Sequence, residues 1–465
     1  MIADDPIRSQ ISDEFIRFLV RRHRSQVVPG LRRLWDYYRN DLDFDTRDEL
    51  RAYHPAQLQG LPSRLTARPT NGSPRETVIE NDIAWRIHAM VDFMFGKPPT
   101  IQSLAEDRPK AALIEWALNS AFEANGGIAF FQDMALLGAI YGYVDVLVRP
   151  ARTSANQTSV ALEIIEPPRA VPVLDESDYR RLDGYVLHYT QPLNRLERES
   201  LLTKLIRRDG AGGRQAAVEV TEIWSPNTVR IWHDGREVDH AINALGAVPV
   251  VHIQNLPQPL FYEGLSEVEP LIPLQDELNT RLSDRANRVT LQSFKMYLAR
   301  GIEGFAQRPV GPGQMWLTDD PNASIESFGG DAASPSEESH INEVREAMDK
   351  TSGVSPLAAG VLRNRVGNLT SENALRVTLM GLLAKTQRKR VTYGRGIERI
   401  CELVLHALHV SGALETSESE RRICLHWPSP LPENGEQRLR EAQLKLEIGV
   451  PRERVLAELG YCGTE

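Results

Sequence analysis

The stretch GLSEVEPLIPLQDELNTRLSDRAN, residues 264–287, decides what kind of fold this chain adopts. Leu274, Leu278 and Leu282 recur every four residues, a spacing that places them on one face of a helix between charged flanks. We therefore expect one long helix over Ser266–Leu298. Roughly 30 residues at a rise of about 1.5 Å make a rod of about 45 Å, which is long for a compact domain.

A small β-module and a second helix are expected directly after this rod. Short β-rich runs cover Met296–Ala299, Gln314–Leu317 and Ser324–Phe328, with turn-forming glycines between them. The sequence SPSE at 334–337 then combines a capping-box serine and glutamate with a proline at the first helical position, which predicts a helix over Pro335–Lys350. This order predicts a rod-shaped pair of helices with a small β-module at its far end.

A loop and a third helix follow in GVLRNRVGNLTSENALRVTLMGLLAKTQRKR, residues 360–390. Glycine, asparagine and two arginines mark the loop, and no Walker-type Gly-Lys-Ser/Thr makes it a nucleotide cradle. The apolar period of the helix continues to about Val410. Gly381, Gly394 and Gly396 are positions where this helix could kink.

The first half of the chain combines helices with strands. We expect helices over Ser12–Ser25, Leu31–Arg39, from about Asn81, and Ile128–Tyr141. Expected strands, separated by turn signals, are Val144–Val148, Val160–Ile165, Gly184–Tyr189, Ala217–Trp224, Val229–His233 and Val248–Ile253. Later in the chain, a strand over Arg422–Trp427 precedes two short helices within Gln437–Gly460. The pattern predicts an α+β fold with an antiparallel sheet.

Charge is distributed unevenly around the loop. The chain has a formal net charge of −9, which argues against binding nucleic acid through a broad basic face. Residues 301–352 hold ten acids and three bases, whereas residues 361–400 hold nine bases and two acids. We interpret these segments first as solvated helix faces that neutralise each other.

Composition excludes other classes of protein. The longest run without charged or strongly polar residues, Met134–Val144, is far shorter than the roughly 20 residues that span a bilayer, so we expect no membrane helix. The first ten residues carry no apolar segment typical of a secretory signal. Cys401, Cys424 and Cys462 are too few and odd in number for a disulfide framework, which fits a reducing compartment.

Signals for catalysis or metal binding are weak. The run Asp41–Asp45 is reminiscent of a calcium loop, but Thr46 and Ala52 replace its glycine and its glutamate, so a solvated loop is the better interpretation. A set of thiols and imidazoles has the residue types of a zinc site but no CxxC, so core residues are the better interpretation here as well; these are Cys401, His406, His409, Cys424 and His426. We predict that the chain is not an enzyme and needs no metal or cofactor.

The chain resembles the portal proteins of tailed bacteriophages, in particular those of long-tailed phages and related prophages. The segments that carry the resemblance are WDYYRND (35–41), ENDIAWRIHAMVDFMFGKPPTI (80–101), LGAVPVVHIQN (245–255), GLSEVEPLIPLQDELNTRLSDRAN (264–287), LTSENALRVTLMGLLAKTQRKR (369–390) and CLHWPSPLPENGEQ (424–437). They follow the order found in the family. The long loop at 53–74 and the short region after ProLeuPro depart from its pattern.

The resemblance implies a portal fold divided along the chain. Its expected parts are the N-terminal wing (1–263), a stem helix (264–294), a small β clip (295–334), a second stem helix (335–352), a tunnel loop (353–370), a long wing helix with a strand (371–432) and a short helical crown (433–465).

The resemblance also implies a function. A dodecameric ring at one capsid vertex would form the channel through which double-stranded DNA is packaged and ejected. It would dock the terminase packaging motor, which supplies the ATPase, and later the head-tail adaptor, and it would contact the major capsid and scaffolding proteins. The protein would assemble in the host cytoplasm and reside in the virion, with no membrane partner.

Two sets of site residues follow from the resemblance. The DNA-proximal tunnel loop would contain Arg363, Asn364, Arg365 and Asn368, and the clip would dock its partners through Arg308, Trp316, Asp319 and Asp320. The two loop arginines would make weak phosphate contacts or pair with the neighbouring subunit, and the sequence favours neither. An alternative from another class is a monomeric, nuclease-like DNA-processing enzyme with a helical insertion.

Overall fold

The computed structural model describes residues 11–39, 78–152, 158–192, 217–293, 296–300, 321–328, 335–359, 376–431 and 435–450, together with Arg452 and Val455. The chain divides into two compact units. The larger unit contains residues 1–35, 84–269 and 353–465, and the smaller unit contains residues 36–83 and 270–352. Helices and antiparallel strands occur together, which confirms the predicted α+β class.

The core of the larger unit lies between a three-stranded sheet and four helices. Strand β2 (Tyr143–Arg152) is central and pairs with β3 (Thr158–Ile165) and β9 (Val250–Gln254), both antiparallel. The helices that pack on this sheet and on one another are α4 (Ala84–Phe95), α5 (Arg108–Ala124), α6 (Ile128–Tyr141) and α11 (Met380–Val410). A two-stranded sheet of β1 (Thr100–Ser103) and β12 (Ile423–His426) joins distant parts of the chain.

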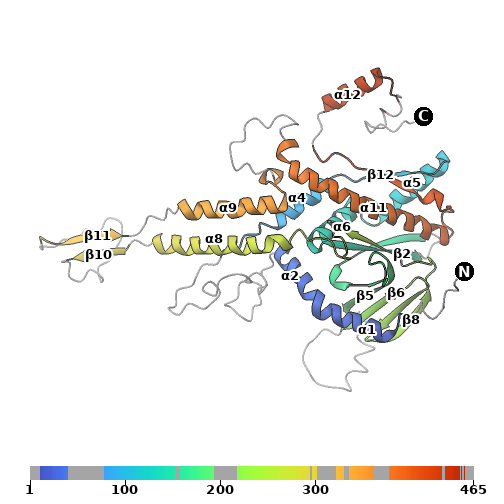
Figure 1. Cartoon of the computed structure of the whole chain (residues 1–465), viewed down its shortest axis with the longest axis horizontal. Coiled ribbons are helices and arrows are strands. Elements are labelled where there is room, and N and C mark those ends of the chain that lie inside the picture. The colour runs from blue at the N-terminus through green and yellow to red at the C-terminus, as the bar shows by residue number, and fades with distance from the viewer. Residues whose placement is uncertain are drawn as a thin grey trace. The chain divides into compact units, whose positions relative to one another are not determined.

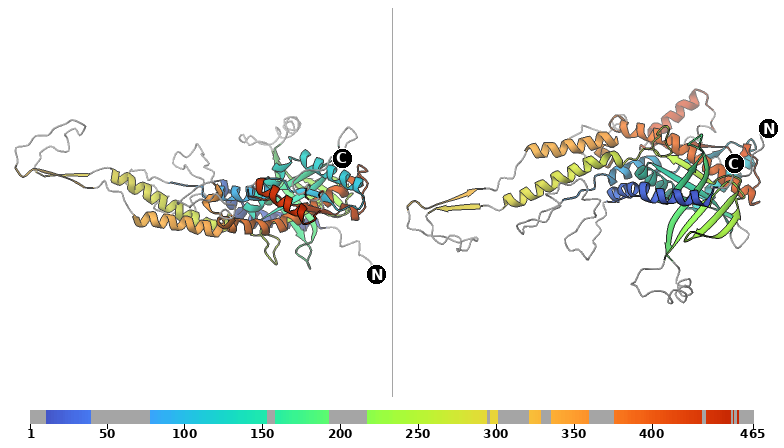
Figure 2. Two further views of the ribbon diagram at one scale, coloured as in Figure 1. Left: turned by 90° about the horizontal axis from the view of Figure 1, so that it is seen from above. Right: turned by 60° about the horizontal axis from the view of Figure 1, so that its bottom comes forward.

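A five-stranded meander forms the second sheet of the larger unit. Its strands pair in chain order and are all antiparallel: β4 (Ala170–Leu174), β5 (Leu182–Pro192), β6 (Ala217–Trp224), β7 (Thr228–His233) and β8 (Arg236–Ile242). Helix α1 (Asp13–Arg22) lies beside these strands, and its Ile16 is buried among Val171, Val186 and Trp232 (Figure 2).

The N-terminal helices are continuous. Ser12 caps α1, and a π-helical turn over His23–Val27 leads into α2 (Val28–Arg39). The sequence predicts two helices with a break between them. The predicted break is wrong. A π-helical turn over His23–Val27 joins the two helices, and Pro29 lies within α2.

The smaller unit contains the predicted pair of helices and the strands between them. Helices α8 (Ile272–Ser293) and α9 (Pro335–Ser352) lie side by side (Figure 1), and they flank β10 (Met296–Arg300) and β11 (Ser324–Phe328), which form an antiparallel hairpin. We call α8 and α9 the helix pair. The start of α9 at its proline and the pairing of the two strands agree with the sequence-based expectation, whereas Gln314–Leu317 lies outside the described residues.

The predicted start of the first rod is wrong. Helix α8 begins at Ile272, after a short 3-10 turn over Glu269–Leu271. The predicted end is wrong as well, because α8 ends at Ser293 and Leu298 lies in β10. The 22 residues of α8 make a rod of roughly 33 Å rather than 45 Å. Pro270 lacks the N–H that an earlier helical turn would need. Ser266 is not helical; its hydroxyl donates to the carbonyl of Ile140 at 2.6 Å.

Several elements were not expected from the sequence. Helix α5 and strands β1, β4 and β8 have weak patterns, and every residue of β8 is exposed, so no alternation marks it. The long helix α11 is continuous from Met380 to Val410 and includes all three glycines named as kink positions. Gly396 instead lets the side chain of Ile253 on β9 lie directly against the helix, and α12 (Gly435–Glu447) starts the predicted C-terminal helices.

Candidate functional site: the helix pair and the long helix

All of the site residues expected from the sequence lie outside the described residues. This applies to Arg363, Asn364, Arg365 and Asn368 of the loop and to Arg308, Trp316, Asp319 and Asp320 of the β-module. The structure does describe the elements that flank them. These are the hairpin β10–β11, the helix pair, and the two ends of the loop segment in the larger unit.

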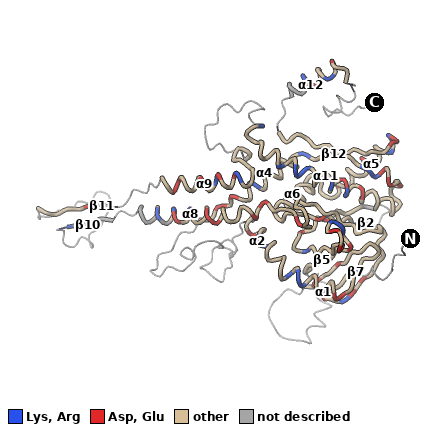
Figure 3. Tube along the Cα trace, in the orientation of Figure 1, with Lys and Arg blue, Asp and Glu red and all other residues tan. Residues whose placement is uncertain are grey.

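Apolar and ionic contacts hold the helix pair together. Ile341, Val344 and Met348 of α9 are buried on one face, as is Leu278 of α8. Arg288 of α8 pairs with Glu337 of α9. Figure 3 shows that acidic and basic residues recur along both helices.

Glu277 connects the two helices through hydrogen bonds. His340 Nε2 lies 3.0 Å from Glu277 Oε1, and Arg281 Nε donates to the same oxygen at 2.7 Å. The bond from His340, and then that from Arg281, lower the pKa of the Glu277 carboxyl below its ordinary value. His340 of α9 therefore restrains the carboxylate of Glu277 on α8, and Arg281 restrains the same carboxylate from within α8.

The second buried face of α8 is polar. Gln275, Asn279 and Ser283 are one helical turn apart and fully or almost fully buried. They bind the backbone of the segment 78–82: Ser283 Oγ accepts from the N–H of Val78 at 2.9 Å, Asn279 Oδ1 from Glu80 at 3.1 Å and Gln275 Oε1 from Asp82 at 3.1 Å. We call this segment the strap. Its hydrogen bonds replace the secondary structure that residues 78–82 lack.

An acidic surface remains on α9. Glu338, Glu343 and Glu346 are exposed on the side away from the buried apolar residues. Anionic side chains at these positions repel phosphate.

The larger unit buries an ionic cluster at α11. Lys385 Nζ donates to Glu267 Oε2 at 2.7 Å, and Lys389 Nζ lies 3.0 Å from Glu267 Oε1 but off the hydrogen-bonding direction. Burial by itself would raise the pKa of Glu267, but the two lysines outweigh it and hold that pKa below its ordinary value. Burial lowers the pKa of Lys389 in spite of its carboxylate partner.

This cluster corrects the interpretation of the basic segment 361–400. Lys389 and Arg390 are buried and Lys385 is partly buried, so these three cations are not part of a solvated helix face. A sequence signal for this existed. Lys389 occupies the same helical face as Leu382, Tyr393 and Ile397, where the apolar period predicts a core residue.

The two ends of the loop segment meet on α11. Gly353 has a φ of +69°, a conformation that favours glycine, and it lies against Gly381 and Lys385. A 3-10 turn over Pro356–Ala359 continues from it and packs on α4. The described residues on the N-terminal side of the segment 360–375 are therefore anchored on α4 and α11 of the larger unit.

A buried carboxylate organises the segment that leads toward α8. Asp145 on β2 accepts from Tyr185 Oη at 2.6 Å and from Tyr262 Oη at 3.1 Å, and His252 Nδ1 lies 2.7 Å from it. His252 Nε2 also lies 2.7 Å from the carbonyl oxygen of Tyr262. These bonds occupy the Asp145 carboxylate, so its role is to hold residues 252–262 on the sheet.

The candidate zinc residues are dispersed. Cys401 is buried in the apolar core, and that burial raises the pKa of its thiol. His406 Nε2 lies 3.1 Å from the carbonyl of Leu245, and His426 Nε2 lies 2.6 Å from Gln102 Oε1. Within the described part of the chain, no three His, Cys, Asp or Glu side chains are grouped so that they could hold a metal ion. The run Asp41–Asp45 lies outside that part.

Among the described residues, no helix combines the length and the apolar character that a membrane span requires.

Comparison with known proteins identifies the family. A sequence model described as phage portal protein, SPP1 Gp6-like, matches residues 19–460, which is nearly the whole chain. No curated protein matches. Similar solved structures include a chain of "Virion of native gene transfer agent (GTA) particle", with 13% identity and a TM-score of 0.44 over 82% of this chain and 89% of that one.

Two further similar structures bear titles that name a neck. A chain of "Neck of empty GTA particle computed with C6 symmetry" has 13% identity and a TM-score of 0.45 over 83% of this chain and 91% of that one. A chain of "Neck of native GTA particle computed with C12 symmetry" has 12% identity and a TM-score of 0.44 over 82% and 89%. The family match carries the assignment: this chain belongs to the SPP1 Gp6-like family of phage portal proteins, structural components of the virion that act at a capsid vertex.

Proposed function

We propose that identical copies of this chain form a closed dodecameric ring around a channel for double-stranded DNA. In this ring the helix pair is the stem and the hairpin is the base of the clip. Residues 353–370 are the tunnel loop, α11 is the long wing helix and α12 begins the crown. DNA passes along the axis during packaging and again during ejection.

The observation that carries the proposal is the helix pair. Each helix buries one side against its partner or the strap, and each keeps charged residues on its remaining surface. The portal family model covers almost the whole chain. Helix pairs of this kind can pack against identical pairs of neighbouring subunits around a central channel.

Electrostatics favour sliding of the DNA. Twelve copies of a formal charge of −9 give a ring of roughly −108, which repels phosphate. The acidic surface of α9 would add to this effect where it faces the channel. DNA then moves without a deep, sequence-dependent energy minimum, and Arg363 and Arg365 supply weak phosphate contacts or intersubunit pairs.

The partners follow from the same assignment. The clip, with Arg308, Trp316, Asp319 and Asp320, docks the terminase motor and later the head-tail adaptor. Major capsid and scaffolding proteins surround the ring as it assembles in the host cytoplasm. The motor, a separate protein, hydrolyses ATP, so the chain itself acts without catalysis.

Size-exclusion chromatography with light scattering, combined with a nuclease assay, tests this function against the enzymatic alternative. A dodecamer of 52.2 kDa subunits has a mass of about 600 kDa. We expect that mass and no cleavage of DNA with Mg²⁺ or Mn²⁺ present. A monomer that cleaves DNA in a metal-dependent way contradicts the proposal and supports the nuclease-like alternative.

A further inference from the structure

Arg390 of α11 is a buried cation that lacks an acidic partner among the described residues. Only 7% of it is exposed, and its guanidinium carbon lies 5.1 Å from the centre of the Trp427 ring. One Nη donates to the carbonyl of Pro428 at 2.8 Å, and Nε has no hydrogen-bond partner. No carboxylate of the described residues forms an ion pair with it, in contrast to Arg149, which pairs with Glu163 and Glu222.

Burial of such a group is costly. Burial lowers the pKa of Arg390, whereas the two carboxylates beside Arg149 raise the pKa of that guanidinium despite its burial. A buried charge is normally compensated by an opposite charge. Stacking on Trp427 and one carbonyl bond compensate Arg390 only in part.

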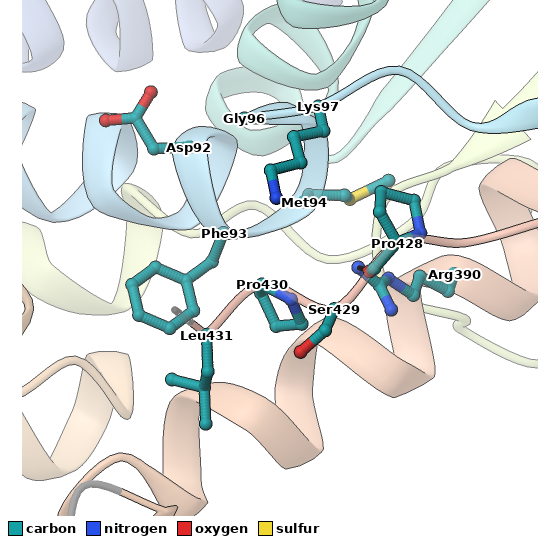
Figure 4. A pocket seen from close by; sticks show the side chains of 10 residues that line it. All are labelled: Asp92, Phe93, Met94, Gly96, Lys97, Arg390, Pro428, Ser429, Pro430 and Leu431. Atoms are coloured by element: carbon teal, nitrogen blue, oxygen red, sulfur yellow. Dashed lines mark hydrogen bonds between the residues drawn. The ribbon is translucent and has the colours of Figure 1, made fainter. Parts of the chain in front are cut away.

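A recess of about 260 Å³ opens beside Arg390, between the end of α4 and residues 428–431. Figure 4 shows the side chains of Lys97 and Arg390 directed toward the space between these segments, and the carboxylate of Asp92 turned away from both cations. Lys97 is exposed and forms no ion pair within the described part of the chain. Apolar walls complete the recess, from Phe93, Pro430 and Leu431.

This combination selects a carboxylate on a peptide. An arginine fork can bind both oxygens of a carboxylate, an ammonium adds a second charge, and apolar walls can take up the neighbouring side chain. A phosphate on a duplex fits less well. The duplex is too wide to enter a recess of this size, and Arg390 is too deeply buried to reach out to it.

We propose that this recess binds the carboxylate of an Asp or Glu side chain from the neighbouring copy of this chain. The proposal rests on the ring described above. In a head-to-tail ring each subunit presents two different flanks to its neighbours, so a cationic recess that lies on one flank would be matched by an acidic side chain on the other. The chain has 63 acids and 54 Lys and Arg residues, so such acids are plentiful.

Zero-length carbodiimide coupling of the purified protein tests the contact. The reagent joins an amine to a carboxylate only where the two already touch, and Lys97 supplies the amine at the rim of the recess. Rings are assembled from a mixture of ¹⁴N- and ¹⁵N-labelled chains, and coupled peptides are read by mass spectrometry. We expect Lys97 joined to an acidic residue in peptide pairs of mixed label, which only an intermolecular contact produces.

Variants on α11 identify the role of the guanidinium. Arg390→Gln should lower the yield of this cross-link by about tenfold, since it removes a charge-assisted pair. Arg388→Gln is the matched control, because Arg388 is exposed two residues earlier on the same helix. It should leave the yield unchanged. Equal yields in the two variants overturn the proposal.

A second variant covers the case in which Arg390→Gln does not fold. Lys97→Glu places a negative charge at the rim on an exposed side chain, and its rings should dissociate at lower NaCl concentration than those of Arg388→Glu. Equal salt stability contradicts the proposal. If rings form but Lys97 couples only within its own chain, the recess proposal is wrong and the ring stands; if no ring forms, the proposed function is wrong.

Discussion

Single buried polar residues contribute more to the stability of this chain than its surface charges do. Glu267, Lys389 and Asn279 are each at least 96% buried, and each binds a group far away in the sequence. Removing one partner of a buried ion pair leaves the other charge uncompensated, so these positions have large effects on stability.

Substitution of Glu267 by Gln should lower the free energy of unfolding by about 3–5 kcal/mol at neutral pH. The amide leaves Lys385 and Lys389 without their carboxylate. Adding Lys389→Met should restore part of the loss, because the second change removes the stranded charge. Chemical denaturation at a fixed protomer concentration measures the free energy of unfolding of both variants. The control is Glu402→Gln, because Glu402 is partly exposed and pairs with Arg399; its free energy of unfolding should fall by less than about 1 kcal/mol.

The same variant has a defined pH dependence. The folded pKa of Glu267 is below its ordinary value of 4.5, so its stabilising contribution is complete above that pH and is lost as the pH falls through the folded value. The folded pKa of Lys389 is below 10.5, so raising the pH toward that value favours the folded chain. The difference between wild type and Glu267→Gln should therefore be largest between these limits and narrow in acid. A difference that stays constant through acid contradicts the ionic origin of the effect.

At the scale of elements, α8 shows what its sequence pattern could and could not predict. The i+4 leucines predicted the helix, and Leu278 is buried as expected. The same spacing in Gln275, Asn279 and Ser283 does not indicate a second buried face. Hydrophobic periodicity marks a face that packs on apolar residues, and a polar face that binds a distant backbone strap carries no hydropathy signal.

Replacement of Asn279 by Ala should loosen the strap. It leaves the N–H of Glu80 without its acceptor and removes an acceptor for Gln275, a loss of about 1–3 kcal/mol. Hydrogen–deuterium exchange should become faster in peptides that cover residues 78–82. Asn342→Ala, at an exposed position on α9, is the control and should leave exchange there unchanged; equal exchange in both variants would mean that Asn279 does not hold the strap.

The proposed tunnel loop, residues 353–370, carries a prediction of its own. Replacement of Arg363 and Arg365 by Ala should leave ring assembly intact and change the efficiency of DNA packaging, because weak phosphate contacts are lost. Light scattering and an in vitro packaging assay measure the two properties. Loss of the ring in this double variant would instead assign the arginines to pairing between subunits.

At the scale of the whole molecule, the order of segments along the chain predicted more than any single motif. Six short stretches in a fixed order indicated a portal protein, and the family match confirms it. Length and composition alone do not indicate an oligomeric state. A count of charges also cannot distinguish a buried ion pair from an exposed one, so it places Lys389 on a solvated surface. The predicted start of α8 is wrong for a similar reason. The apolar periodicity continues through Pro270, but the α-helical backbone begins only at Ile272.

The central claim is that the helix pair packs against the helix pairs of identical neighbouring subunits around a central channel. Electron microscopy of the purified full-length chain tests it most directly. Class averages should show closed rings with a central channel, and the three-dimensional map should place α8 and α9 of every copy around that channel. Single, well-folded particles at high protein concentration, or rings whose channel is lined by other elements, would contradict the account.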